Sequence, residues 1–482
     1  MRAIVLDEPE LEFGAGGRHI DPRFGVATYG PVDAGLDGAP SRIRIGIVGP
    51  QAAVEGVRSW LHRAREPINA KTPRYPGQSH LFPSFPGFSP ETSFRCVLAL
   101  DERNMRSIPK SSVAELTKAD AANAVRVAVD AYLAQIRWLA ESGTCDVIVC
   151  ARPPELDIFE PDDQTPRQRR SRRDGPPPIK PDFHDQLKAA ALPLAPPLQV
   201  IRPETWDDAY KPPKGTPTRR VQDPATRAWN LHTALYLKAG GAPWRLIRSF
   251  SDAASCFLGV SFFRSADNTE IHTSVAQIFN ERGEGVVVRG GPAAITKADR
   301  QPHLAEQPAM SLLSDSLAAY RQEHGNLPAR LVIHKTSRFT ESEKAGFAAA
   351  AEAHLIGELE LVWVAHRDSA RLFRFGQHPP LRGTLLEVAH DRHVLYTKGS
   401  VDFYEAYPGM YVPNPITIRP VEMTHRPELL AEEMLALTKL NWNHSQLDGR
   451  LPITLRAART VGHILRHVTD GQGVARRYHF YM

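Results

Sequence analysis

Short apolar segments alternate with longer amphipathic segments through the first half of the chain, and this alternation restricts the possible folds more than any other feature. Ile43–Pro50 reads as a buried strand, and the amphipathic stretch Ala52–Arg65 follows it. The same kind of pattern continues in the segments Phe94–Leu100, Ala119–Glu141, Cys145–Cys150 and Leu198–Ile201. Strands that alternate with helices form a parallel sheet with helices on both faces. We therefore predict an α/β domain with a Rossmann-like sheet.

The second half of the chain begins with a different pattern. Three apolar strands follow one another, at Cys256–Phe263, His272–Phe279 and Gly285–Arg289. Helical and strand patterns then alternate in the segments Met310–His324, Ala329–His334, Glu341–Ala353 and Leu359–Val364, and two further helices are predicted at Pro427–Leu440 and Thr454–His467. Antiparallel strands followed by βαβ units are the order of a ribonuclease-H-like domain.

A glycine-rich segment near the start, Phe13-Gly-Ala-Gly-Gly, loosely matches a dinucleotide-binding loop. Such a loop must be preceded by a strand and followed by a helix. We predict a turn at Ile20–Phe24 instead of a helix, so the sequence argues against a nucleotide site here.

Composition narrows the class of protein only slightly. The chain has 482 residues, enough for two domains, and its net charge of +5 permits a polyanionic partner without requiring one. None of the four cysteines stands in a Cys-x-x-Cys pair, so we expect reduced interior thiols. Neither a signal peptide nor a long apolar run is evident, which predicts a cytoplasmic protein without a membrane partner.

Three motifs then point to a family. Lys238 ends a helical pattern before a glycine pair, Gly259-Val-Ser261 forms the tip of an apolar strand, and Asn441-Trp-Asn443 lies further on. Together with Leu-Glu-Phe-Gly and Gly-Pro motifs, they resemble a short prokaryotic Argonaute, a MID–PIWI protein, over nearly the whole chain.

The resemblance implies a domain order. An N-terminal segment, 1–40, would pack on the PIWI side. Residues 41–245 would form the Rossmann-like MID domain that binds the guide, and residues 246–482 the ribonuclease-H-like PIWI domain.

In this family, a MID pocket binds the 5′-phosphate of the guide through a Tyr-Lys-Gln-Lys signature. Cationic groups that converge on a small volume suit a phosphate. The resemblance assigns this role to Tyr210, Lys211, Lys214, Arg219, Arg220, Gln222 and Lys238. Spacing alone favours a structural role for Lys238. A cation at the C-terminus of a helix interacts favourably with the helix dipole, and Gly240 would be the C-cap.

The last residues, Tyr478-His-Phe-Tyr-Met482, are apolar and aromatic. The resemblance implies that the Met482 carboxylate reaches the MID pocket and helps to hold Mg²⁺ on the guide phosphate. Core packing of Phe480 is the alternative explanation.

Cleavage by two metal ions needs several carboxylates at one edge of the sheet. When this chain is aligned with active relatives, neutral residues stand at the positions of their metal-binding aspartates. Active relatives also have a mobile catalytic glutamate, for which Glu306 is the candidate here. The degenerate positions are Ser261, Thr336, Asn441 and Asn443. We therefore expect no catalytic metal and no enzymatic activity in this chain.

The resemblance also implies a function. Such proteins bind a 5′-phosphorylated guide RNA, recognise a single-stranded DNA target and form a heterodimer with an APAZ-domain effector, with higher oligomers on activation. Effectors include NAD-consuming sirtuin-like or TIR domains and nucleases, which defend the cell against plasmids or phage.

Other interpretations remain open at this stage. An active ribonuclease-H-like nuclease would need carboxylates near Ser261, for which Asp252, Asp267 and Glu270 are the candidates; a nonspecific nucleic-acid binder would need none. His463 and His467, with Asp470, have the spacing of a weak metal site. A proline-rich loop contains Arg167, Arg169, Arg170, Arg172 and Arg173, which either face solvent or contact a nucleic-acid backbone.

Overall fold

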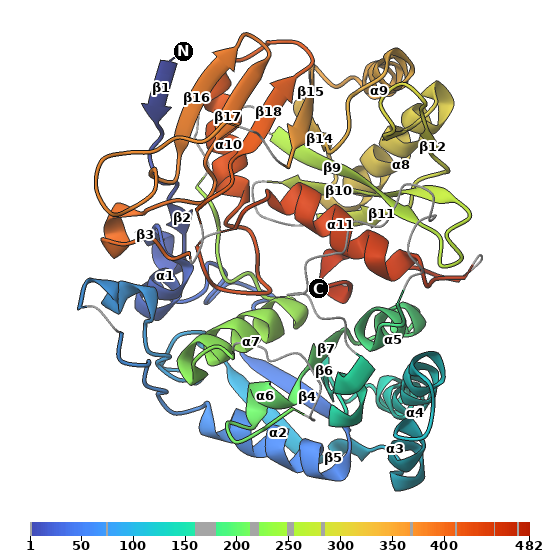
Figure 1. Cartoon of the computed structure of the whole chain (residues 1–482). Helices are drawn as coiled ribbons and strands as arrows, with labels where there is room; N and C mark the ends of the chain where they lie inside the picture. The colour runs from blue at the N-terminus through green and yellow to red at the C-terminus, as the bar shows by residue number, and fades with distance from the viewer. Residues whose placement is uncertain are drawn as a thin grey trace.

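The chain folds into two α/β halves that lie one above the other, with the C-terminal residues between them (Figure 1). The structure is a computed structural model. It describes residues 2–73, 76–159, 180–212, 221–247, 255–280, 285–366, 370–409, 412–447, 449–469 and 472–482.

The first half contains a four-stranded parallel sheet in the order β5-β4-β6-β7. Its strands are β4 (Arg42–Gly49), β5 (Val97–Ser107), β6 (Val147–Ala151) and β7 (Leu198–Ile201). The helices of this half are α2 (Gln51–Arg63), α3 (Lys110–Leu116), α4 (Ala121–Ser142), α5 (Phe183–Ala191), α6 (Pro203–Trp206) and α7 (Pro224–Lys238).

Both faces of this sheet are covered, as predicted. Side chains of α2 and α7 belong to one buried apolar cluster, and those of α4 and α5 belong to another. All five residues of β6 are buried, which accounts for their continuous apolar character. The helices begin where the sequence provides caps: Asp120 and Asp223 accept backbone N–H bonds at the starts of α4 and α7.

The second half contains a nine-stranded mixed sheet in the order β1-β16-β17-β18-β15-β14-β9-β10-β11. Among its described strands, the parallel pairs are β14 with β9 and β14 with β15. The strands of this half are β9 (Ser255–Arg264), β10 (Ile271–Asn280), β11 (Gly285–Val288), β14 (Arg330–Lys335), β15 (Glu358–Ala365), β16 (Thr384–Ala389), β17 (Arg392–Leu395) and β18 (Ile416–Pro420). An antiparallel meander followed by βαβ units is the predicted ribonuclease-H-like order.

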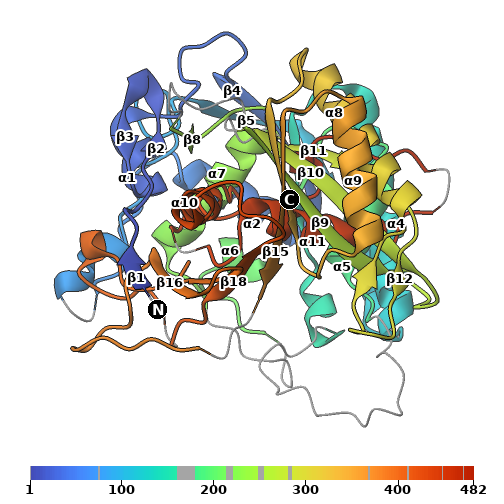
Figure 2. The ribbon, with the colours of Figure 1, turned by 90° about the horizontal axis from the view of Figure 1, so that it is seen from above.

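Four helices cover this sheet (Figure 2). Side chains of α8 and α9 pack on one face, and those of α10 and α11 pack on the other. These helices are α8 (Glu306–His324), α9 (Glu341–Ala353), α10 (Pro427–Leu437) and α11 (Ile453–Leu465).

The start of α11 lies directly against β9. A Cβ atom at Gly259 would come within 2.2 Å of the Thr454 carbonyl oxygen, so only glycine permits this approach. The Thr454 hydroxyl is also 2.9 Å from Nδ1 of the buried His334 on β14. These contacts fix α11 relative to the strands beneath it.

The N-terminal segment joins both halves. Its first strand, β1 (Arg2–Val5), pairs with β16 at the edge of the large sheet. A small sheet joins β2 (Leu11–Glu12) to β3 (Arg18–His19) and to β8 (Arg245–Leu246), the connection between the halves.

The predicted turn at Ile20–Phe24 is wrong. Helix α1 (Pro22–Tyr29) begins there, because the Asp21 side chain accepts from the backbone N–H groups of Arg23 and Phe24 and proline occupies the first helical position. The preceding glycines form a short 3-10 turn, Gly14–Gly16, which lies between two-residue strands and does not open a long helix.

The remaining described elements are short. They are β12 (Ala294–Ile295), β13 (Pro302–His303) and the 3-10 helices η2 (Pro76–Leu81), η3 (Pro154–Phe159), η4 (Asp402–Tyr404) and η5 (Tyr478–Phe480). All four cysteines are buried free thiols, as predicted. Among the described residues, no helix combines the length and apolar character needed to cross a bilayer.

Candidate nucleic-acid interface

A cluster of buried polar and ionisable groups lies where the two halves meet, and Lys238 is at its centre. The ammonium of Lys238 donates to the Met482 carbonyl oxygen at 3.0 Å and to Oε1 of Gln199 on β7. Both Lys238 and Met482 are almost fully buried. Lys188, Gln199, Lys238, His479 and Met482 are referred to below as the junction pocket.

The local sequence explains why Lys238 points inward. It is the last residue of α7, and the chain then turns through Gly240, whose φ of +93° favours glycine. A Cβ atom at Gly241 would come within 2.3 Å of the Tyr236 ring. The Lys-Ala-Gly-Gly sequence is therefore needed to end the helix at this point.

A second buried cation, Lys188 of α5, belongs to the same pocket. Its side chain is 2 % exposed, and its ammonium has no hydrogen-bond partner in the described parts of the chain. Burial lowers the pKa of Lys188 to about 7, against an ordinary value of 10.5. Burial, followed by the charge of Lys188, holds the pKa of Lys238 well below its usual range. The two ammonium groups are therefore close enough to repel each other.

The C-terminal residues close the pocket. Tyr478, Tyr481 and Met482 are buried in the large apolar core cluster, and Phe480 packs against it. Burial lowers the pKa of His479 to about 4, and the charges of Arg477, Lys238 and Lys188 act in the same direction. The pocket therefore has an excess of cationic groups.

The structure brings together only part of the predicted phosphate site. Lys238 and Met482 meet, but the Tyr210 hydroxyl donates to Asp157 at 2.6 Å, Lys211 is exposed, and Gln222 accepts from Asn230 at 3.0 Å. Lys214, Arg219 and Arg220 lie outside the described residues, as do the arginines of the proline-rich loop. The sequence interpretation missed Lys188 and Gln199, which precede Lys238 in the order Lys-Gln-Lys.

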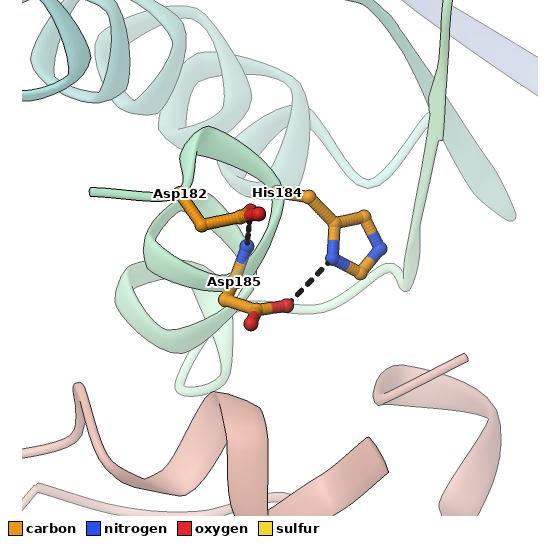
Figure 3. A group of neighbouring side chains, drawn as sticks. All are labelled: Asp182, His184 and Asp185. Carbon is orange, nitrogen blue, oxygen red and sulfur yellow. Dashed lines mark hydrogen bonds and ion pairs between the residues drawn. The ribbon is translucent and has the colours of Figure 1, made fainter. Parts of the chain in front are cut away.

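The N-terminus of α5 contains a group of potential metal ligands (Figure 3). Ligand atoms of Asp182, His184 and Asp185 lie within 4.8 Å of one another. However, the Asp182 carboxylate caps the helix by accepting from the Asp185 N–H at 3.0 Å, and Nδ1 of His184 lies 2.8 Å from the Asp185 carboxylate. Capping and this pair account for the arrangement without a metal.

The structure brings Ser261, within β9, and Thr336, directly after β14, into one cavity. Val260 of β9 is in register with Lys335 of β14, and the next residue on each strand lines a common cavity of about 330 Å³. The whole lining is Ser261, Phe262, Phe263, Thr336, His366, Leu455, Arg459, His463 and Arg466. These residues include no carboxylate.

A larger cavity of about 690 Å³ shares His366, Arg459 and His463 with the first cavity. It is also lined by Arg450 and Arg456 and, from the first half, by Asp185. The two cavities form a groove along α11, which we call the α11 groove. Its lining is strongly cationic, with one acid at the α5 end.

Asn441 and Asn443 do not line the cavity of Ser261 and Thr336. Nδ2 of the buried Asn441 is 2.5 Å from Nε2 of His444, and Asn443 is exposed. The third wall comes instead from α11 and carries Arg459, which the sequence interpretation missed. The signal was present, because Arg456, Arg459, His463 and Arg466 recur at helical spacing on an otherwise apolar helix.

The remaining sequence candidates lie elsewhere. Asp267 and Glu270 are in the turn between β9 and β10, and Glu306 is exposed at the first position of α8. Trp442 is buried, as expected of a core residue. Asp252 and Asp470 lie outside the described residues.

Comparison of the whole fold with solved structures gives two informative matches. One is Clostridium butyricum Argonaute bound to a guide DNA and a 19-mer target DNA, with a TM-score of 0.62 and 15% identity over 98% of this chain and 53% of that chain. The fold is that of the MID–PIWI portion of Argonautes. The other is Aa-Ago with externally bound siRNA, with a TM-score of 0.59 and 15% identity over 99% of this chain and 55% of that chain.

The chain thus spans about half the length of the solved Argonautes it matches. No protein-family model matches the sequence, and neither does any curated protein. The first half is called the MID half below, and the second is called the PIWI half. In these terms, the junction pocket lies between the two halves, and the α11 groove crosses the PIWI half.

Proposed function

We propose that this protein binds a 5′-phosphorylated guide RNA through the junction pocket, pairs it with a single-stranded DNA target and does not cut that target. Pairing of guide and target would instead activate a partner protein. The likeness of fold to Argonautes, one of which is bound to a guide and a target, supports a guided mode of binding.

The buried ammonium of Lys188 is the observation that carries this proposal. A charged group without a hydrogen-bond partner in the interior is costly unless a ligand supplies its counter-charge. A terminal phosphate would accept hydrogen bonds from Lys188 and Lys238 and would raise the pKa of both.

Mg²⁺ is the ion that this pocket would take. The Met482 oxygen and Oε1 of Gln199 already converge on one ammonium, and both are hard oxygen ligands of the kind that Mg²⁺ accepts alongside phosphate. When bound there, the ion would offset the charge of the phosphate. It would have no part in cleavage.

The lining of the cavity in the PIWI half supports the proposed absence of cleavage. Two metal ions require carboxylates, and the described cavity around Ser261 and Thr336 is lined instead by Arg459, His463 and Arg466. Hydroxyl groups beside guanidinium groups do not offset two divalent charges.

The partner comes from the resemblance to short prokaryotic Argonautes. We propose a heterodimer with an APAZ-domain effector, either an NAD-consuming sirtuin-like or TIR domain or a nuclease, that assembles further when guide and target pair. The result would be defence against plasmids or phage.

A nonspecific nucleic-acid binder is the second candidate, and the α11 groove favours it. A cationic groove attracts any polyanion and requires no 5′-phosphate. The two candidate functions differ in whether the affinity for a strand depends on its 5′-phosphate.

Competition between 5′-phosphorylated and 5′-hydroxyl RNA of one sequence tests the proposal. We expect the wild type to prefer the phosphorylated strand, and Lys188→Met with Lys238→Met to remove that preference while keeping residual salt-sensitive binding. Equal affinity of the wild type for both strands would favour the nonspecific binder.

A further inference from the structure

The cavity around Ser261 and Thr336 is unsuited to a metal pair but well suited to an anion. Its described lining contains two arginines and two histidines and no carboxylate. At about 330 Å³ it also has room for a phosphate group and the water around it.

The two arginines differ in their surroundings. Burial lowers the pKa of Arg466, and the carboxylates of Asp185 and Asp182 act in the opposite direction. Arg459 is exposed, and no ion pair of its guanidinium occurs within the described residues. Nε of Arg466 is buried and has no hydrogen-bond partner there. Burial lowers the pKa of His463, and the positive charges of Arg466 and Arg459 contribute to this effect. The carboxylate of Asp185, across the interface, acts in the opposite direction.

The position of these cations is fixed by the fold. Arg459, His463 and Arg466 lie four and three residues apart, so they share one face of α11. That helix is held against β9 at Gly259 and against β14 through His334. Ser261 of β9 and Thr336, directly after β14, line the same cavity as these cations.

We propose that Arg459 and Arg466, with the hydroxyl groups of Ser261 and Thr336, form a metal-independent site for one backbone phosphate of a bound nucleic-acid duplex. Guanidinium groups bind phosphate oxygens in a bidentate manner and keep their charge at any physiological pH. The proposal rests on the proposed function for the identity of the duplex. Its residues are separate from the junction pocket.

Binding at this phosphate therefore does not depend on Mg²⁺. It also gives the PIWI half a fixed register on the duplex, because backbone contacts position a protein without reading the sequence. The cavity that would hold metals for cleavage holds the uncut linkage instead.

The test uses a preformed RNA–DNA duplex whose DNA strand carries one neutral methylphosphonate linkage, moved along the strand in a series. In EDTA, one linkage should weaken binding to the wild type about tenfold. Arg459→Gln with Arg466→Gln should weaken the unmodified duplex by a similar factor and should lose the sensitivity to that linkage. The slope of log affinity against log salt should fall by roughly 0.9 for the lost phosphate contact.

Controls separate this proposal from the proposed function and from misfolding. Arg137→Gln, an exposed arginine on α4, should leave duplex affinity unchanged. The double variant should keep its preference for a 5′-phosphorylated guide and the thermal unfolding midpoint of the wild type. Arg459→Lys should retain part of the affinity.

Two results would overturn the proposal. One is an unchanged affinity of the double variant for the duplex in EDTA. The other is a double variant that stays sensitive to the same methylphosphonate linkage that weakens binding to the wild type. Failure of the wild type to prefer a 5′-phosphate would contradict the proposed function instead. A duplex with a 5′-hydroxyl guide would still report on the α11 groove in that case.

Discussion

The junction pocket and the α11 groove are both cationic, but they hold their charge in different ways. Lys188 and Lys238 are buried almost completely, whereas Arg459 is exposed on a helix. Lysine yields its proton when it is desolvated, as the lowered pKa values of both lysines indicate, while arginine stays charged.

The difference in burial implies a difference in selectivity. A buried site admits one terminal group and excludes solvent, so it can distinguish a 5′-phosphate from a 5′-hydroxyl. An open groove interacts with any backbone phosphate and weakens as salt rises. The four predictions that follow test this contrast, beginning with the largest expected effect.

The first prediction concerns Lys238. Lys238→Ala should weaken binding of 5′-phosphorylated RNA by about 1.5–3 kcal/mol, roughly 10- to 150-fold, because it removes a charge-assisted hydrogen bond in a buried site. Affinities measured by fluorescence anisotropy check this. Lys211→Ala is the comparison, since Lys211 is exposed in the structure although the sequence placed it in the pocket. An equal loss in both variants would contradict the geometry of the pocket.

The second prediction is that the junction pocket destabilises the guide-free protein. Lys188→Met should raise the thermal unfolding midpoint in the absence of guide, by an amount equivalent to about 1–3 kcal/mol, because it removes a buried charge without a hydrogen-bond partner. Lys118→Met, at an exposed position, should change stability by less than about 0.5 kcal/mol.

The pH dependence of this stability difference has a definite sign. The folded-state pKa of Lys188, about 7, lies below the ordinary value of 10.5, so the unfolded chain binds more protons between these values. Wild-type stability should therefore gain from this group as pH rises through that range. The extra stability of Lys188→Met over the wild type should therefore shrink as pH rises. A difference in the free energy of unfolding that stays constant from pH 6 to 10 would contradict a buried titrating lysine.

The third prediction concerns guide binding and pH. A phosphate favours the protonated form of Lys188, so binding should take up a proton above about pH 7. Affinity for 5′-phosphorylated RNA should fall by up to about tenfold per pH unit between roughly pH 7 and 9. Isothermal titration calorimetry in buffers of different ionisation enthalpy measures the proton uptake. The 5′-hydroxyl strand should show no such dependence.

The fourth prediction concerns the PIWI half and is the smallest. Introducing carboxylates through Ser261→Asp with Thr336→Asp should not create a nuclease, because Arg459 and Arg466 would pair with them. The new charges should instead lower duplex affinity a few-fold, roughly 0.5–1 kcal/mol. Ser261→Asn with Thr336→Asn is the neutral control. Guided cleavage by the aspartate variant would show that the arginines do not control this cavity.

Much of the fold could be predicted from periodicity. Most predicted segments lie close to observed elements, because each has one strong apolar pattern. These elements are the strands β4, β6, β7, β9, β10, β11, β14 and β15 and the helices α4, α8 and α9. Helix α1 is harder to predict, because the pair Asp21-Pro22 is as typical of a turn as of the helix start that it forms here.

The pocket was harder to predict than the elements that form it. Lys238 stands out beside its glycine pair, but Lys188 and Gln199 reach it only because parallel strands bring the ends of β7, α5 and α7 together. The spacing of these three residues in the sequence does not predict that they lie close together. One local signal existed: Lys188 stands among apolar residues, where a cation is unusual.

The third wall of the Ser261 cavity was misassigned for a similar reason. Asn441 and Asn443 follow α10 in irregular chain, and their position could not be inferred from a motif. The motif assigns this wall to neutral amides, whereas α11 presents the cation Arg459 to the cavity.

One experiment measures both the binding of a target strand and whether that strand is cut. The protein is loaded with 5′-phosphorylated RNA, and a labelled complementary DNA strand is added in Mg²⁺ and, separately, in Mn²⁺. The account predicts that the target binds stably, that binding depends on the guide phosphate and on Lys238, and that the strand stays intact over hours. A shorter labelled product that requires both the guide and the divalent ion would contradict it.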